Sequence, residues 1–280
     1  MKNLIPMLLT ILPLLACTGD LSQSRLDALS DRPVAERLPE IEALMVKHPG
    51  DARLSELWSD TKWEELSTMD PVAKIEHLKA SLRENPENGL LSKLLGDAYS
   101  DHAHGAGGDS YLDSALFAYE NAALKMPDYL PAVGSVGSLY DEMEDYDQAV
   151  FWYDRALSVR PDHVPTLVNL GASLYNKGDS NKAMDAYRKA LEVDPDSQDA
   201  HYNLGVAFAE AQLYREAVVE WDRVVEIDPA TPVAGQAKSN STLLKEVLAE
   251  TSYKGGRKVK RQDRSDEPAK EEAEKVRKKQ

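Results

Sequence analysis

The chain has 280 residues, of which 42% are hydrophobic and 29% are charged, so it can bury a sizeable core and is neither a disordered chain nor a multi-pass membrane protein. Its formal net charge of −15 argues against a nucleic-acid binder, because a protein that neutralises phosphates needs a basic face. A single cysteine excludes an intramolecular disulfide framework, so packing must supply the stability.

Residues 1–16 have the composition of a secretory signal peptide. Lys2 supplies a positive charge, an apolar run follows it to Leu15, and the small Ala16 precedes Cys17. The ending Leu-Leu-Ala-Cys resembles the lipobox of bacterial lipoproteins. The resemblance implies cleavage before Cys17, lipidation of this cysteine and anchoring of the mature protein to a membrane by its acyl chains. The alternative is an ordinary signal peptide followed by a free cysteine.

The same resemblance implies a location in the bacterial cell envelope. Thr18 follows the cysteine, whereas enterobacterial lipoproteins retained in the inner membrane carry an aspartate there. This difference favours the periplasmic face of the outer membrane. Residues 17–33 are then the lipidated cysteine and a short linker.

Residues 34–88 show only fragments of helical periodicity. Leu44 to Pro49 and Ser81 to Pro86 have the form of helix ends closed by a proline, and Leu54 to Leu66 has the apolar spacing of a helix. We expect one or two degenerate helical hairpins that cap the N-terminal end of the fold.

A repeat of 34 residues organises the middle of the chain, because Gly137, Gly171 and Gly205 are 34 residues apart. Apolar residues recur at helical spacing on both sides of a turn in each unit, and a proline, which cannot continue a helix, closes the second helix. Each unit is therefore predicted to be an antiparallel pair of helices whose small residues lie where the two helices cross closely. The same period relates Ala149, Ala183 and Ala217; Tyr153, Tyr187 and Trp221; and Pro161, Pro195 and Pro229.

This pattern resembles the tetratricopeptide repeat, whose conserved Leu-Gly, Ala-x-x-x-Tyr and closing proline occur here as Leu170-Gly171, Ala183-x-x-x-Tyr187 and Pro195. The resemblance implies an all-α fold, a right-handed superhelical solenoid of antiparallel helical hairpins that binds a protein or peptide. Units of this kind cover residues 130–163, 164–197 and 198–231. Residues 89–129 fit a further unit with seven extra residues in its turn, since Gly96 and Ala115 are 19 residues apart whereas Gly137 and Ala149 are 12 apart.

The C-terminal region divides into a helix and a charged tail. Residues 232–252 are predicted to form a capping helix, because polar positions in this segment can solvate the last apolar face of the array. Residues 253–280 are predicted to be disordered when free. From Lys254 onward there are 11 Lys or Arg and 6 Asp or Glu, which give a net charge of +5. The preceding chain has the remaining 22 Lys or Arg and 42 Asp or Glu, which give a net charge of −20. The tail is either a basic arm for an anionic partner or a solvated tail.

The first helices of tetratricopeptide units line a concave wall, and by resemblance the corresponding residues here form a partner-binding groove. Small side chains leave space beside two tyrosines, and acidic groups follow one edge, which favours an extended or helical peptide with apolar anchors and basic flanks. The alternative is a solvated helix face. A carboxylate clamp is not expected, since only Lys93 is basic among the lining residues. The predicted groove residues are Gly134, Ser138, Asp141, Glu142, Val168, Ala172, Tyr175, Asn176, Tyr202, Val206, Ala209 and Glu210.

The inserted turn of the 89–129 unit carries potential metal ligands. Imidazole and carboxylate groups suit zinc or nickel, and two histidines one residue apart can chelate an ion from an extended strand. A structureless Gly-rich surface loop is the favoured interpretation, so no metal is assigned. The residues concerned are Asp101, His102, His104 and Asp109.

No catalytic constellation is present in the sequence. Cys17 is assigned to the lipobox, no Gly-rich phosphate-binding turn occurs, and the acidic pairs have the spacing of helix-surface charge. Trp152 lies outside the packing register of the repeat and either packs against a neighbouring unit, which is the favoured reading, or faces a partner. The chain is therefore predicted to be neither an enzyme nor a cofactor protein.

Two functions remain in competition at this level. The first is a membrane-anchored scaffold or adaptor that mediates protein–protein interaction in the assembly of a cell-envelope complex, similar in layout to pilotins of pili and secretion systems and to scaffolds of peptidoglycan enzymes. The alternative is a lipoprotein that binds cell-wall glycan or anionic lipid through its basic tail. Nucleic acid is not an expected partner.

Overall fold

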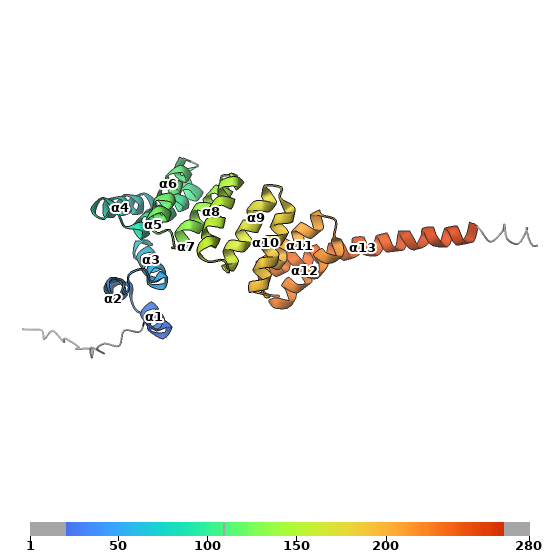
Figure 1. The fold of residues 1–280 in the computed structure, drawn as a ribbon, viewed down its shortest axis with the longest axis horizontal. Helices are drawn as coiled ribbons and strands as arrows, with labels where there is room; N and C mark the ends of the chain where they lie inside the picture. The colour runs from blue at the N-terminus through green and yellow to red at the C-terminus, as the bar shows by residue number, and fades with distance from the viewer. Residues whose placement is uncertain (1–20, 109, 266–280) are drawn as a thin grey trace, which may run out of the picture. The chain divides into compact units, whose positions relative to one another are not determined.

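The computed structural model describes residues 21–108 and 110–265, and within these ranges it consists of thirteen α-helices and one π-helical turn without a strand (Figure 1). The predicted all-α fold is confirmed. The chain divides between residues 74 and 75 into two compact units, which are described separately.

The first unit contains three helices: α1 (Gln23–Ser30), α2 (Val34–Lys47) and α3 (Ala52–Leu66). Asp51 caps α3 by accepting hydrogen bonds from the backbone amides of Arg53 and Leu54, which would otherwise lack partners at the start of the helix. Ile41 on α2 and Leu54 on α3 are fully buried. Helices α2 and α3 therefore form the hairpin expected in this region.

Helix α1 lies inside residues 17–33, which the sequence predicts to be a linker, so that prediction is wrong for Gln23–Ser30. Leu26 and Leu29 are three residues apart and both are buried, and their burial stabilises this short helix. Two apolar residues are too few to produce a recognisable helical period, so the helix depends on contacts that the local sequence does not reveal.

The second unit begins inside α4 (Pro71–Glu84) and continues as four helical hairpins and a long terminal helix. In each hairpin we call the first helix A and the second helix B. The hairpins are α5 (Gly89–His102) with α6 (Ser110–Lys125), α7 (Leu130–Glu142) with α8 (Tyr146–Val159), α9 (Val164–Asn176) with α10 (Ser180–Val193), and α11 (Gln198–Glu210) with α12 (Tyr214–Ile227), and α13 (Pro232–Ser265) follows them.

The repeated glycines lie under the repeated aromatic rings, as the 34-residue period predicts. A Cβ atom on Gly171 would lie 2.4 Å from Cε1 of Tyr187, and one on Gly205 would lie 2.6 Å from Nε1 of Trp221. These distances are shorter than carbon can tolerate, so only glycine lets helices A and B approach this closely. Gly96 meets Tyr119 and Gly137 meets Tyr153 in the same way.

The turn between helices A and B has its own 34-residue signature in the backbone. Glu144, Gly178 and Gln212 occupy equivalent positions, and their φ angles are 59°, 96° and 62°. A left-handed residue is thus required at this point of each turn, and only the middle repeat supplies the glycine that adopts this conformation without strain.

The seven-residue insertion is helical over most of its length. The sequence favours a structureless loop, but α5 continues to His102 and is followed by a π-helical turn at Ala103–Gly107. The ring of His102 packs edge-on against Tyr111, with 4.4 Å between ring centroids. The insertion therefore lengthens the first helix of its hairpin without altering the packing of Gly96 against Tyr119.

Helix α13 ends the array because it is a helix A that cannot receive a helix B. Leu170, Gly171 and Leu174 accept helix B in a complete repeat, and the equivalent residues of α13 are Lys238, Ser239 and Thr242, which are exposed. On its other side α13 packs against α12 and α11 and buries Ala234, Ala237 and Ser241. Its polar outer face gives it the composition of a terminal cap.

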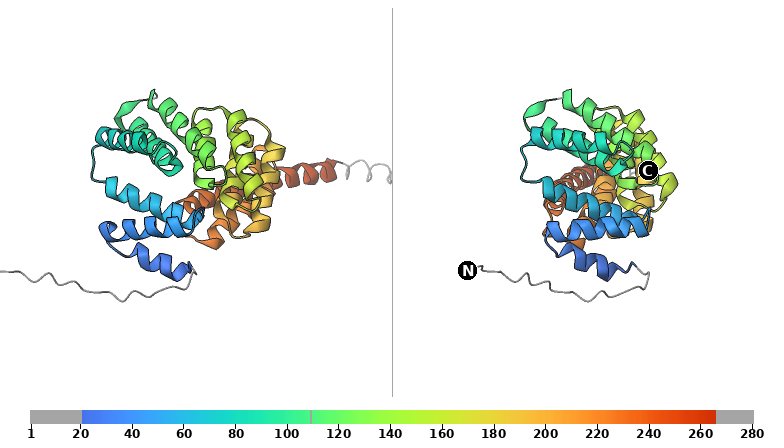
Figure 2. Two further views of the ribbon diagram at one scale, coloured as in Figure 1. Left: turned by 60° about the vertical axis from the view of Figure 1, so that its left-hand side comes forward. Right: turned by 90° about the vertical axis from the view of Figure 1, so that its left-hand side faces the viewer.

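The same helix is longer than predicted. The sequence divides the region into a cap that ends at residue 252 and a disordered segment from residue 253, whereas α13 continues to Ser265 and projects beyond the last hairpin (Figure 2). Gly255 and Gly256 lower helix propensity by only about 1 kcal/mol each, and Lys and Arg favour the helix. Two glycines therefore do not end a helix as a proline does.

Candidate functional site

Helices A line the inner side of the curved second unit. Helix α9 touches both α7 and α11, and α11 touches α13, whereas the corresponding contacts between successive helices B are sparser. A stack whose helices A are closer together than its helices B curves towards the helices A. We call the surface formed by α7, α9, α11 and α13 the inner face.

Most of the predicted groove residues are accessible on the inner face. Ser138, Glu142, Asn176 and Glu210 are exposed, and Val168 is fully buried. Val168 belongs to the hydrophobic core that joins the hairpins, so its prediction as a lining residue is wrong. The half-buried lining residues are Gly134, Asp141, Ala172, Tyr175, Tyr202, Val206 and Ala209.

The inner face has open space at Gly134. No atom lies within 4 Å of a Cβ built on this glycine, in contrast to Gly137 three residues later. Gly134 is therefore not required for the packing of its own repeat. It leaves a shallow position beside Ser138 that a partner side chain can fill.

The two tyrosines are held in place by contacts with other helices of the array. Burial and a hydrogen bond to the Glu210 carboxylate raise the pKa of Tyr175 to about 12, and this bond joins α9 to α11. The ring of Tyr202 lies 6.5 Å from that of Trp221, whose indole Nε1 donates to the Tyr202 carbonyl oxygen over 3.1 Å. Both rings thus present partly exposed apolar surface from fixed positions.

Asp141 joins repeats instead of presenting a free carboxylate. It accepts hydrogen bonds from the hydroxyls of Tyr153 (2.9 Å) and Ser173 (2.6 Å), which lie on α8 and α9. Burial raises the pKa of Asp141 in spite of these bonds. One repeat earlier, Asp97 accepts from Tyr119 and pairs with Lys93, both of which belong to its own hairpin.

The candidate metal ligands have other partners. His104 Nδ1 lies 2.7 Å from the Ser100 carbonyl oxygen and its Nε2 lies 2.7 Å from the Glu142 carboxylate, so the insertion is tied to the end of α7. Asp101 is exposed, and Asp109 lies outside the described residues. Within the described ranges, no three His, Cys, Asp or Glu side chains are arranged to hold a metal ion.

The inner face extends onto α13, which the sequence prediction omits. Leu243 lies 34 residues after Ala209 and its side chain is 61% exposed, and the half-buried Leu244 stands at the position of Glu210. Continuing the 34-residue spacing past the last complete unit would have identified both residues. Leu243 is the most exposed large apolar side chain on this face.

A cavity lies outside the inner face, between α4, α5 and α6. It has a volume of about 400 Å³ and is lined mainly by apolar side chains, including Leu82, Leu95 and Phe117. Phe117 is 71% exposed. On the neighbouring hairpin, Trp152 is buried under the guanidinium of Arg155, so the packing interpretation holds for Trp152, and Phe151 is the exposed aromatic residue.

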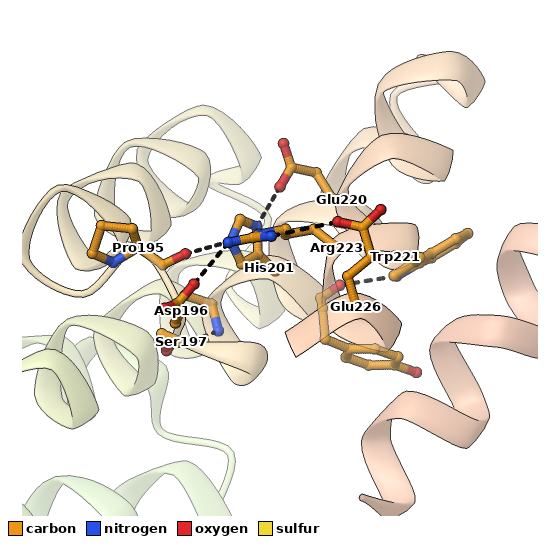
Figure 3. A network of polar contacts seen from close by, with 10 residues as sticks. Pro195, Asp196, Ser197, His201, Glu220, Trp221, Arg223 and Glu226 are labelled. Carbon is orange, nitrogen blue, oxygen red and sulfur yellow. Dashed lines mark hydrogen bonds and ion pairs between the residues drawn. The ribbon is translucent and has the colours of Figure 1, made fainter. Parts of the chain in front are cut away.

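A polar network beside Tyr202 holds α11 against α12 and against the turn that precedes it (Figure 3). His201 Nδ1 lies 2.6 Å from the Glu220 carboxylate, and its Nε2 lies 3.0 Å from the Pro195 carbonyl oxygen. Two acceptors require both ring nitrogens to carry protons, which only the charged imidazolium provides. Next to it, Arg223 pairs with Asp196 (2.8 Å) and Glu226 (3.4 Å).

We predict that this network makes stability depend on pH. Burial lowers the pKa of His201, but the Glu220 carboxylate and the Pro195 carbonyl together outweigh burial and raise the pKa above its ordinary value of 6.5. A raised folded-state pKa gives stability that is fully present below about pH 6.5 and is lost as the pH rises through the folded value. The free energy of unfolding of the wild type, minus that of His201→Gln, should therefore be largest at low pH.

Urea denaturation between about pH 5.5 and 9 measures this difference. The titration of other groups, His104 among them, is common to both proteins and cancels in the subtraction. A difference that does not change with pH would show that His201 is neutral in the folded protein.

Two parts of the sequence interpretation fall outside the described residues or their side chains. Cys17 and the signal segment precede residue 21, and the tail side chains from Thr251 onward are not described. Within the described part of the chain, none of the helices combines the length and the apolar composition that crossing a bilayer demands.

Known proteins support the assignment of the repeats. Family models described as "TPR repeat" and "Tetratricopeptide repeat" match residues 171–212 and 131–163. No curated protein matches the chain in sequence.

Several solved structures share the fold. A crystal structure of MamA is 21% identical with a TM-score of 0.53, covering 60% of this chain and 94% of its own. MamA 41-end from Desulfovibrio magneticus RS-1 is 17% identical with a TM-score of 0.53 over 65% of this chain and 98% of its own. YrrB, described as a TPR protein with an unusual peptide-binding site, is 18% identical with a TM-score of 0.52 over 71% of this chain and 97% of its own. At these identities the likeness concerns the fold alone.

Proposed function

We propose that this chain, an all-helical protein with tetratricopeptide repeats, is a membrane-anchored adaptor that binds a partner peptide on its inner face during assembly of a cell-envelope complex. Tetratricopeptide repeats mediate protein–protein interaction, and the chain acts by binding instead of by catalysis. The partner supplies any chemistry that the complex performs.

The accessible tyrosines carry the proposal. Tyr175 and Tyr202 are half-buried, the first beside Glu210 of the next repeat and the second beside Trp221 of its own repeat, so a ligand can cover their rings without a large loss of side-chain freedom. Small residues and the open position at Gly134 leave room for apolar anchors between them. The description of YrrB as having a peptide-binding site supports the same use of the repeats here.

The membrane anchor is proposed from the sequence Leu14-Leu15-Ala16-Cys17, which has the form of a lipobox. Acyl chains on Cys17 would hold the mature protein to the periplasmic face of the outer membrane, because more than one buried chain is needed for stable attachment. The helical units would then extend from the membrane and present the inner face to proteins of the envelope.

One crosslinking pull-down from membranes tests both parts. The wild type is expected to capture a defined protein, and Tyr175→Ala/Tyr202→Ala is expected to lose it, because two hot-spot aromatics typically carry much of the binding energy. Cys17→Ser is expected to leave the membrane fraction while keeping its affinity for the captured protein in solution.

A variant of equal size on another surface is the control. Phe151→Ala removes an exposed aromatic side chain from α8, outside the inner face, and should capture the partner as the wild type does. Capture that survives Tyr175→Ala/Tyr202→Ala but disappears on deletion of residues 254–280 would contradict the proposal in favour of binding through the basic tail.

A further inference from the structure

We infer that the inner face, extended by the end of α5, is polarised, acidic at its α5–α7 end and apolar at its α11–α13 end, and that it takes a peptide with a block of basic residues at one end and a block of large apolar residues at the other. The inference rests on the proposed function, because it specifies which peptides that surface binds. Its evidence is the change in residue type at equivalent positions along the repeats.

The two rows of inner-face residues near the C-terminal end of each helix A show the change. One row begins with Ser100 and Asp141 and ends with Ala209 and Leu243. The neighbouring row begins with Asp101 and Glu142 and ends with Glu210 and Leu244. From α7 onward members of a row are 34 residues apart, and the α5 members are 41 residues before those of α7 because of the seven-residue insertion. Charge at one end of the rows gives way to apolar residues at the other.

At the acidic end the carboxylates exceed the cations. Lys93 pairs with Asp97 at 2.9 Å and Asp141 is held by Tyr153 and Ser173, which leaves Asp101 and Glu142. Among the described residues His104 opposes them, through its 2.7 Å contact with Glu142, and the Ser100 carbonyl and the Glu142 carboxylate raise the pKa of this exposed histidine.

A cleft of about 570 Å³ lies beside Glu142, between the start of α6 and the turn after α7. Asp113 and Glu144 line it together with Glu142, and Leu112 and Met143 supply an apolar wall. Carboxylates around an apolar wall fit the long aliphatic stem and charged end of Arg or Lys. A basic side chain of the peptide can replace His104 at Glu142.

At the apolar end two carboxylates have partners, whereas Glu246 of α13 is exposed. Glu210 is bonded to the Tyr175 hydroxyl, and Asp222, behind α13, is held by Ser241 and Lys245. The apolar part of the accessible surface there comes from Tyr202, Val206, Ala209 and the 61% exposed Leu243, beside the polar Gln236 and Asn240 of α13. Burial of this apolar surface is favourable when the partner also presents apolar side chains.

The basic tail of the chain itself lacks one of the two blocks. Residues 254–280 carry a net charge of +5, but Val259 and Val276 are their only large apolar residues. A surface that requires both blocks should discriminate against this segment, whereas a surface that selects charge alone should bind it. The tail is therefore a natural negative control.

The test measures the binding of labelled peptides to the full mature chain by fluorescence anisotropy. Four helices about 10 Å apart span roughly ten extended residues, so the probes are about twelve residues long. They are Lys/Arg followed by Leu/Phe, the reverse order, and an alternating peptide of the same composition. The segment 254–280 is the fourth probe. One block order should bind at least about tenfold more tightly than the alternating peptide and the tail segment, a difference of about 1.4 kcal/mol.

Variants at the two ends then assign the blocks. Glu142→Lys should lower the affinity for the preferred peptide about tenfold. It should have no effect on a peptide in which serines replace the basic block. Leu243→Ser should likewise lower the affinity for the preferred peptide, and should have no effect on a peptide in which serines replace the apolar block. Glu216→Lys and Val219→Ser make equal changes at exposed positions of α12, away from the inner face, and should leave affinity unchanged.

The outcomes separate the two proposals. The polarity would be overturned if binding needed Tyr175 and Tyr202 but did not depend on the order of the two blocks. It would also be overturned if the effects of Glu142→Lys and Leu243→Ser did not depend on the basic and the apolar block, respectively. In both cases the inner face would remain a peptide-binding site. Binding that is indifferent to the two tyrosines would overturn the proposed function. Failure of all four probes to bind at millimolar concentration would overturn the polarity as stated.

Discussion

Gly171→Ala is expected to destabilise the second unit by about 1–3 kcal/mol, although alanine is the better helix former. The added Cβ would lie 2.4 Å from Tyr187 Cε1, and the ring cannot yield because Tyr187 is 2% exposed and packed between hairpins. Either α9 moves away from α10 or the ring leaves its rotamer, and both results cost packing. For a unit of this size, each kcal/mol should lower the midpoint of thermal unfolding by about 2–4 °C.

Gly134→Ala is the matched control, since it makes the same chemical change inside helix α7. No atom lies within 4 Å of its Cβ, so only the gain in helix propensity remains, and the variant should be more stable by about 0.5–1 kcal/mol. In the Tyr187→Leu background the cost of Gly171→Ala should fall, because the obstructing ring is absent. Equal stability of the two alanine variants would contradict the close approach of α9 and α10.

Trp221→Ala should have the largest effect of any single substitution considered, a loss of about 3–5 kcal/mol in the free energy of unfolding. The indole is 4% exposed, packs over Gly205 and donates its N–H to the Tyr202 carbonyl, so truncation leaves a cavity and removes a hydrogen bond between α11 and α12. Urea denaturation followed by circular dichroism measures the loss through the shift of the midpoint.

Trp221→Tyr provides the comparison, because Tyr153 and Tyr187 hold the equivalent position in the two preceding repeats. A tyrosine at residue 221 should recover most of the stability lost in the alanine variant and lack only the bond to the Tyr202 carbonyl. If the tyrosine variant were as unstable as the alanine variant, the last repeat would not be packed like the others.

Periodicity in the sequence was sufficient for the architecture of residues 130–231. The helix pairs, the glycine beneath each ring and the closing proline are contacts within one unit, and they recur wherever the unit recurs. For the candidate site, the same spacing predicted Tyr175 and Tyr202 on the first helices of their units, and the structure finds both half-buried on α9 and α11. The same spacing leads to Leu243, which lies in the helix that follows the last complete unit and was not among the predicted groove residues.

The repeat pattern in the sequence did not predict contacts between residues of different repeats. Val168 has the spacing of a lining residue, yet it is buried in the core between the hairpins. Asp141 has the charge of a surface group, yet its carboxylate accepts hydrogen bonds from Tyr153 and Ser173. The helix at Gln23–Ser30, the π-helical turn at Ala103–Gly107 and the continuation of α13 to Ser265 likewise depend on more than local composition.

The sequence by itself determined the repeating unit, because helix formation and the crossing of two adjacent helices depend on residues within one period. Only the tertiary structure decided which side chains of that unit stay accessible, since exposure depends on how each hairpin stacks on the next and on partners such as Glu142 for His104 and Glu210 for Tyr175. Those partners lie 38 and 35 residues away in the chain, in a neighbouring repeat.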